Sequence, residues 1–133
     1  MNNITDNNTY NLIKSALGAT NVRQSVISNN ISNVNTSNFK ASKVEFEDTL
    51  KNVLDQNSIS MRYTNEKHMG MALNDIQPEI IKDDTTEIKL NGNNVDMEKE
   101  MVDMAANQIL YNSLVQQANK KLSNLSYVIS GGR

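Results

Sequence analysis

Apolar residues in the last third of the chain recur at alternating steps of four and three residues. Nine of the ten positions on this stripe are apolar, and Gln108 is the exception. A strict 3.5-residue period predicts a long helix whose narrow apolar stripe faces a partner helix. At 1.5 Å per residue, such a helix is about 50 Å long. The predicted seam contains Met97, Met101, Met104, Gln108, Tyr111, Val115, Ala118, Leu122, Leu125 and Ile129.

The same spacing near the N-terminus predicts a second heptad helix, with Asn8 or Thr9 suited to its N-cap. Neither stripe is wide enough for its helix to be stable alone in water, so we expect the helices to pair within or between chains. A polar seam residue often sets the register of such a pair, and we expect Gln108 to meet Gln24 or Thr20. The N-terminal seam contains Tyr10, Ile13, Leu17, Thr20, Gln24, Ile27, Ile31 and Val34.

A shorter helix is predicted over residues 44–56, because Phe46, Leu50, Val53 and Leu54 share one helical face. Periodicity fades between residues 57 and 94, which indicates an extended, irregular segment. Asn94 or Asp96 can cap the C-terminal helix, and Gly131 or Gly132 can end it.

The predicted fold is therefore all-α, with long terminal heptad helices in a coiled-coil-like hairpin or bundle, a short third helix and an extended middle. Its three parts are an N-terminal helix and turn motif (1–40), a middle segment (41–94) and a C-terminal helix (95–133). Hydrophobic residues make up only 38% of the 133 residues, so we expect a thin core that is completed in an assembly.

Composition narrows the function classes. The net charge is −2, and no block of the chain is basic enough to predict nucleic-acid binding. No run of apolar residues is long enough to span a membrane, and the polar N-terminus lacks the pattern of a secretory signal. We therefore expect no nucleic-acid partner, no membrane insertion and no cleaved signal peptide.

Candidate chemistry is sparse. The chain has no cysteine, and His68 is its single histidine, which we interpret as a surface residue. No serine lies in a nucleophile elbow, and no glycine-rich phosphate loop or EF-hand pattern occurs. We predict no catalytic residue, cofactor or metal site, and we do not expect an enzyme.

Residues 29–40 carry the most specific motif. The sequence NNISNVNTSNFK resembles a signature of bacterial flagellar rod, hook and basal-body axial proteins, in which Asn-Asn-Ile-Ala-Asn precedes Thr-Pro-Gly, an aromatic and a basic residue. Ser37-Asn38 replaces Pro-Gly, and Asn38 can still adopt the left-handed conformation that the turn needs. The matching residues are Asn29, Asn30, Ile31, Asn33, Thr36, Phe39 and Lys40.

The start of the C-terminal helix, NGNNVDMEKEM at residues 91–101, resembles the corresponding signature of proximal rod members of this family. This resemblance implies a structural subunit that polymerises through its terminal helices into a torque-transmitting tube around an export channel. It implies as partners other copies and other rod proteins, the adaptor between membrane ring and rod, and the export gate. It also implies export by the flagellar type III apparatus to the basal body, outside the cytoplasmic membrane.

The resemblance also implies a docking signal for the export gate. In early flagellar export substrates this signal is a Phe, three further residues and an aliphatic residue. Phe46 and Leu50 fit this pattern, although any amphipathic helix offers such a pair. The heptads alone leave a second function open, that of a coiled-coil adaptor or export chaperone.

Overall fold

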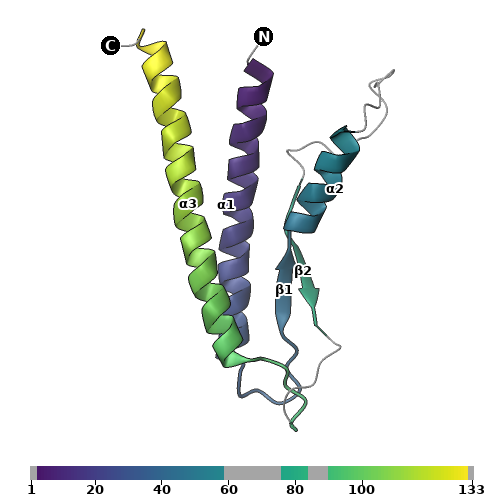
Figure 1. The fold of residues 1–133 in the computed structure, drawn as a ribbon. Helices are drawn as coiled ribbons and strands as arrows, with labels where there is room; N and C mark the ends of the chain where they lie inside the picture. Colours follow the sequence, from purple (N-terminus) through teal and green to yellow (C-terminus); the bar gives the residue numbers. More distant parts are fainter. Residues whose placement is uncertain (1–2, 59–75, 84–89, 132–133) are drawn as a thin grey trace.

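Two long antiparallel helices, α1 (Asn3–Ser32) and α3 (Met97–Ile129), form the frame of the computed structural model. The structure describes residues 3–58, 76–83 and 90–131, without the side chains of residues 3–8 and 53–58. Both termini lie at one end of the helix pair, and the helices diverge toward that end (Figure 1). The predicted pair of long terminal helices is confirmed.

The N-terminal helix is longer than predicted. It begins at Asn3, so the prediction of an N-cap at Asn8 or Thr9 is wrong. Asn, Asp and Thr in these first turns are only weakly unfavourable inside a helix, so they do not prevent it from extending.

A small antiparallel sheet joins strand β1 (Ser42–Glu45) to strand β2 (Glu79–Lys82), with Val44 opposite Ile80. Neither strand is predicted from the sequence, because four residues are too few for a clear alternating pattern. Helix α2 (Glu47–Ser58) consequently begins later than predicted, since Val44 belongs to the sheet. The middle segment is thus partly ordered by a strand pair.

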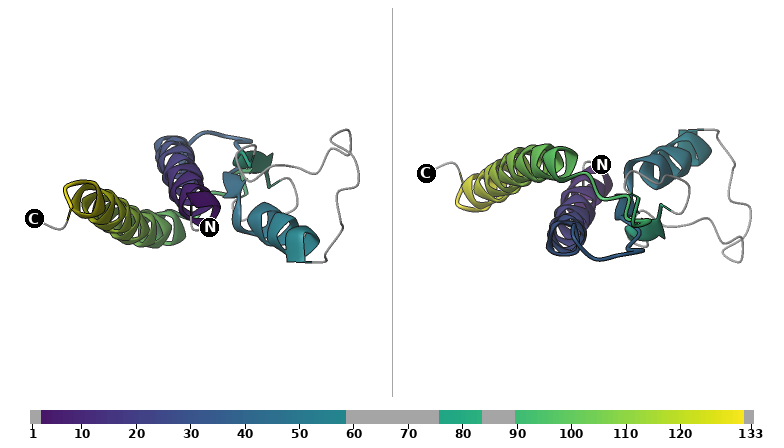
Figure 2. Two further views of the ribbon diagram at one scale, coloured as in Figure 1. Left: turned by 90° about the horizontal axis from the view of Figure 1, so that it is seen from above. Right: turned by 90° about the horizontal axis from the view of Figure 1, so that it is seen from below.

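Helix α1 forms the central layer, between α3 on one side and the sheet with α2 on the other (Figure 2). The small core on the sheet side contains Ala19, Phe46 and Ile76, and Leu50 packs against it. Phe46 is only 4% exposed. Phe46, which immediately precedes α2, and Leu50 of α2 thus pack beside Ala16 and Ala19 of α1, whereas the side chains of Val53 and Leu54 lie outside the described residues.

Both ends of α3 follow the predicted chemistry. The Asp96 carboxylate accepts hydrogen bonds from the backbone N–H groups of Glu98 and Lys99, at 3.0 and 3.3 Å. This contact satisfies two of the free donors at the helix start. At the other end Gly131 adopts a positive φ of 71°, the conformation that commonly ends a helix.

Candidate assembly surfaces

The motif at residues 29–40 forms the turn that leaves α1. Asn38 has a φ of 58°, as predicted, and the N–H of Phe39 donates to the carbonyl oxygen of Thr36 at 3.4 Å. The Asn33 amide group donates to the Asn29 carbonyl oxygen at 2.8 Å and so supports the helix end. Asn29 itself is exposed.

Asn30 joins three elements and is 1% exposed. Its Nδ2 group donates to the Ser42 carbonyl oxygen of β1 at 2.7 Å and to Oε1 of Glu100 on α3 at 3.0 Å. Its Oδ1 accepts from the Ser42 N–H at 3.0 Å. A buried amide with all its contacts made fixes the relative position of α1, β1 and α3.

Asn93 and Asn94 connect the second motif to the first. The Asn93 Nδ2 group donates to the carbonyl oxygens of Asn33 and Thr36, at 2.9 and 2.8 Å. Asn94 accepts from the Ala41 N–H at 2.6 Å and donates to the Asp83 carbonyl oxygen, also at 2.6 Å. We call Asn30, Asn93 and Asn94, with these hydrogen bonds, the base clasp. The two sequence motifs, about 60 residues apart, therefore build one structure.

The remaining motif residues contribute less. Phe39 and Lys40 are half-buried beside the clasp, and the Thr36 hydroxyl donates to Oδ1 of Asn33 at 3.2 Å. The sequence predicts only a possible helix cap for Asn94, a role that Asp96 fills in the structure, and it predicts no role for Asn93. Their position within the second motif was the available signal.

The predicted N-terminal seam faces inward over most of its length. Ile13 and Ile27 are buried, Leu17, Ile31 and Val34 are half-buried, and Tyr10 is 38% exposed. Thr20 is also buried. The increase in exposure toward Tyr10 follows the divergence of the two helices.

The C-terminal seam is only partly turned toward α1. Met104, Tyr111 and Val115 are half-buried, whereas Gln108 is exposed and donates to Oδ1 of Asn112 at 3.3 Å. The prediction that Gln108 meets Gln24 or Thr20 is wrong within the chain. Ala118 is also half-buried, and the other five seam residues are exposed, namely Met97, Met101, Leu122, Leu125 and Ile129.

Asn107 occupies the place predicted for Gln108. It is 4% exposed, and its Nδ2 group donates to the Thr20 carbonyl oxygen at 3.0 Å and to Oε1 of Gln24 at 2.9 Å. Among the described residues, its Oδ1 has no hydrogen-bond partner. Most of the buried or half-buried residues of α3 repeat with the same heptad spacing in a different phase, and Val115 of the predicted seam is half-buried beside them. The residues in this phase are Glu100, Met104, Asn107, Tyr111, Leu114, Ala118 and Lys121.

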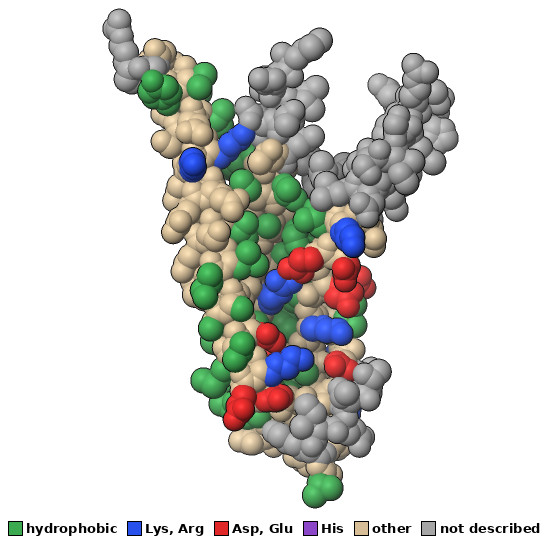
Figure 3. Space-filling view, in the orientation of Figure 1, with side chains coloured by type: hydrophobic (Ala, Val, Ile, Leu, Met, Phe, Trp, Pro, Cys, Tyr) green, Lys and Arg blue, Asp and Glu red, His purple; other side chains and the backbone are tan. Residues whose placement is uncertain are grey.

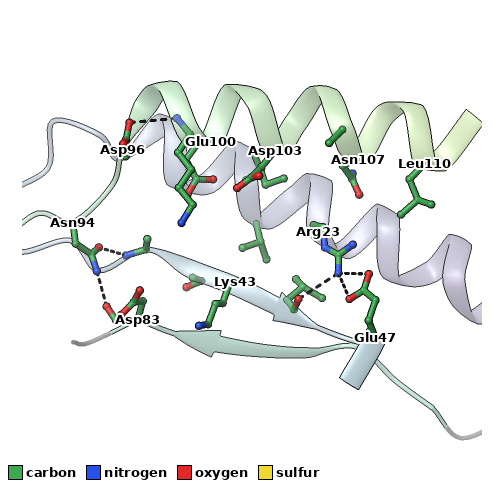
Figure 4. Close-up of a pocket in the computed structure, with 17 residues that line it drawn as sticks. Arg23, Lys43, Glu47, Asp83, Asn94, Asp96, Glu100, Asp103, Asn107 and Leu110 are labelled. Carbon is green, nitrogen blue, oxygen red and sulfur yellow. Dashed lines mark hydrogen bonds and ion pairs between the residues drawn. The ribbon is translucent and has the colours of Figure 1, made fainter. Parts of the chain in front are cut away.

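A groove of about 470 Å³ lies between α1, β1 and the first half of α3 (Figure 4). Val26, Ile27 and Val44 form its apolar floor, and all three are buried. Acidic and basic side chains gather along it in the space-filling view (Figure 3). We call this feature the base groove.

The Arg23–Glu47 ion pair lies at one end of the base groove. The Arg23 Nη2 group contacts the two Glu47 carboxylate oxygens at 2.8 and 2.6 Å and donates to the Val44 carbonyl oxygen at 3.4 Å. The hydrogen bond from Arg23 lowers the pKa of Glu47. Because the Glu47 side chain is 61% exposed, the pair adds little to stability.

Glu100 lies nearer the other end of the base groove, close to the base clasp. Partial burial raises the pKa of its carboxyl, while the hydrogen bond from Asn30 opposes this effect. Two of the carboxyl groups in the groove therefore have pKa values that are shifted in opposite directions by different physical causes.

The described residues offer little for metal or membrane chemistry. No group of three or more His, Cys, Asp and Glu side chains in residues 3–58, 76–83 and 90–131 is placed to hold a metal ion. Within the same residues, no helix is both long and apolar enough to cross a bilayer. His68 lies outside the described residues.

Comparisons with known proteins agree with the two motifs. Residues 13–40 match the model of the "Flagella basal body rod protein" family. FlgB of Bacillus subtilis, named as a flagellar basal body rod protein, is 38% identical over 91% of this chain and 92% of its own length. FlgB of Borreliella burgdorferi is 31% identical over 85% and 89%, and that of Buchnera aphidicola is 30% identical over 94% and 96%. The chain therefore belongs to the FlgB family of flagellar basal body rod proteins.

Proposed function

We propose that the chain is a structural subunit of the proximal part of the flagellar rod and that it polymerises through its terminal helices. One observation supports this proposal most strongly. Helix α3 leaves large apolar residues exposed on several of its faces, including Met101 at 57%, Val102 at 67% and Val128 at 74%. Large apolar residues exposed in this way indicate surfaces that pack against other helices.

Contacts between different faces of identical subunits generate a helical tube when the rotation does not close. In this proposal the exposed part of the C-terminal seam packs on neighbouring subunits, together with the half-buried part of the N-terminal seam. The resulting tube encloses the export channel and transmits torque. The exposure of Met97 and Met101 suits this role, because thioether side chains fill irregular gaps.

The three predicted parts of the chain acquire separate roles in the proposal. The helical segments in 1–40 and 95–133 form the axial layer, and the described part of the middle segment, residues 41–58, 76–83 and 90–94, packs beside it. The base clasp supports this division, because it joins all three parts through the side chain of Asn30 and the amides of Asn93 and Asn94.

The proposed partners are other copies, other rod proteins, the adaptor between membrane ring and rod, and the type III export gate. The proposed location is the basal body outside the cytoplasmic membrane. Phe46 and Leu50 remain candidates for the gate signal, yet both lie in or against the core. They can reach an export gate only in a chain that is not yet folded, so core packing and gate docking occur at different times.

A coiled-coil adaptor or export chaperone shares the heptad helices but does not account for the two rod-protein motifs. Circular dichroism and size-exclusion chromatography of the purified chain separate the two functions. A stable, fully helical small oligomer at micromolar concentration supports the adaptor, and partly ordered terminal helices support the rod subunit.

Deletion of the gene in the source bacterium tests the main proposal. We expect flagellar assembly to stop before the hook, with motility restored by the gene on a plasmid. A deletion strain with normal filaments contradicts the proposed function.

A further inference from the structure

The free end of α3 presents an apolar surface that α1 does not cover. Every described residue of α3 after Lys121 is exposed. Leu122 is 49% exposed, Leu125 38% and Ile129 84%. We call Leu122–Ile129 the α3 tip, and Figure 3 shows hydrophobic side chains gathered near this end of the molecule.

The base groove lies at the opposite end of the helix pair, and its charge complements that of the second half of α3. Besides its apolar floor, the groove is lined by five carboxylate side chains and three cationic side chains, so its rim is acidic. One of these cations, Arg23, is already engaged by Glu47. The second half of α3, from Leu114 to Ile129, instead contains Lys120 and Lys121 and no acidic residue. The charges of the groove and of this half of α3 are therefore opposite in sign.

We propose that the α3 tip of one subunit docks in the base groove of a second copy of this chain, an inference that rests on the proposed rod function. The apolar tip residues cover the groove floor, and the exposed Lys120, which precedes the tip, approaches the acidic rim at Asp103. The groove follows α3 from Asp96 to Leu110, about 20 Å at 1.5 Å per residue, which is longer than the eight-residue tip.

The tip cannot occupy the groove of its own chain. Ala106 in the groove and Leu125 in the tip lie on one uninterrupted helix, about 28 Å apart along its axis. The contact is therefore between chains and joins two different surfaces. Repetition of such a contact adds subunits head to tail instead of closing a dimer.

A buried oxygen in the groove wall gives a second, independent reason for an occupant. Asn107 lines the base groove, and its Oδ1 is buried without a donor among the described residues. An unsatisfied buried acceptor destabilises the free subunit. A tip that brings a hydrogen-bond donor into the groove removes this cost, whereas a purely intramolecular groove leaves it in place.

Two single-cysteine variants test the contact directly, because the natural chain has no cysteine. Ala106→Cys places a thiol in the groove, and Leu125→Cys places one in the tip. Cells that produce both variants are oxidised, and basal bodies are isolated and examined for cross-linked dimers. We expect about tenfold more dimer than with Ala105→Cys plus Leu125→Cys, because a disulfide requires close Cα atoms and residue 105 is on another face of α3.

Each outcome of this experiment decides the inference. Dimer formation that is equal for Ala105→Cys and Ala106→Cys overturns it, as does a Leu125→Cys homodimer without the groove partner. Rods that form normally without any cross-link overturn it while leaving the proposed rod function intact. Normal filaments in the deletion strain instead contradict the rod function itself.

Charge reversal covers the case in which the cysteine variants do not assemble. Asp103→Lys is expected to lower swimming speed at least about tenfold, and Lys120→Glu in the same chain is expected to restore it. Glu79→Lys is the matched control, since Glu79 is exposed on β2 outside the groove. An Asp103→Lys strain that swims as well as the Glu79→Lys strain, or a double variant without recovery, overturns the inference.

Discussion

The base of the molecule and the tip of α3 are stabilised in opposite ways. At the base, the buried amides of Asn30, Asn93 and Asn94 make short hydrogen bonds to several segments, so their polar groups are paired within the chain. At the tip, Leu122, Leu125 and Ile129 are exposed, and apolar area remains available for other molecules. The comparison indicates that the base holds the segments of the subunit together, and that the tip leaves apolar area uncovered, which the proposed assembly buries.

Asn30→Asp is the strongest test of the base. The new carboxylate oxygen faces the Ser42 carbonyl oxygen and the Glu100 carboxylate, and both formerly accepted from Nδ2. We expect the free energy of unfolding to fall by about 3 kcal/mol in urea denaturation followed by circular dichroism. Asn29→Asp, at the exposed neighbouring position, is the control and should cost less than about 0.5 kcal/mol. Equal losses in the two variants would contradict the role of the clasp.

Asn107 lies between the base and the tip of α3. Substituting it with a polar residue should lower the free energy of unfolding more than substituting it with an apolar one. Asn107→Asp removes the donor to Thr20 and Gln24, so we expect a loss of about 2 kcal/mol of unfolding free energy. Asn107→Leu removes these bonds and the unsatisfied Oδ1 together, so we expect a change within about 1 kcal/mol. The same urea titration measures both. A leucine variant as unstable as the aspartate variant would show that the lost bonds dominate.

The pH dependence of stability sharpens the comparison within the base. The pKa of Glu100 is raised above 4.5, so the folded chain binds its proton more tightly and stability falls as the pH rises through this pKa. We expect Glu100→Gln to gain up to about 1 kcal/mol near neutral pH and nothing in acid below the usual pKa.

Glu47 provides the matched control of opposite sign. Its pKa is lowered, so its contribution is present above 4.5 and is lost as the pH falls through the folded-state pKa. Glu47→Gln should therefore slightly lower the free energy of unfolding near neutral pH and leave it unchanged in acid. Glu100→Gln should raise the free energy of unfolding above the acid range. Unfolding curves that shift in the same direction with pH for both variants would contradict the opposite assignments.

Leu125→Ser should have the smallest effect on the subunit. The side chain is 38% exposed, so we expect a loss below about 0.5 kcal/mol in unfolding free energy. Leu114→Ser, on the inward face of α3, should cost about 2 kcal/mol. Motility should nevertheless fail in the Leu125→Ser strain. A motile strain, or a subunit as unstable as the Leu114→Ser variant, would remove the distinction between base and tip.

The long helices could be predicted because a heptad pattern extends over many turns in each. The phase of the seam could not, since the stripe through Gln108 and the stripe through Asn107 share Met104, Tyr111 and Ala118. Counting apolar residues favours the first stripe, but all of its extra apolar residues except the half-buried Val115 are exposed. The inward phase depends on a buried amide that meets Thr20 and Gln24, and such pairing is invisible without the partner helix.

The motifs marked the right residues without showing how they act. Asn38 could be assigned a positive φ from its place in the turn, because only a few residue types tolerate that conformation. The contacts of Asn93 with Asn33 and Thr36 cross a long stretch of chain, so local rules did not reveal them. The strands were missed for the same reason, since β1 is stabilised by β2 rather than by its own four residues.

The wide sequence separation of the contacts between α1 and α3 also sets the order in which the molecule can fold. Asn30 and Glu100 are separated by 70 residues, and Thr20 and Asn107 by 87. While the chain is being made, α1 therefore lacks its partner until almost the whole sequence is present, and a thinly striped helix is marginal alone. Closing so long a loop is slow compared with forming a local turn. An incomplete chain thus lacks the pairing of α1 with α3 that the finished subunit has.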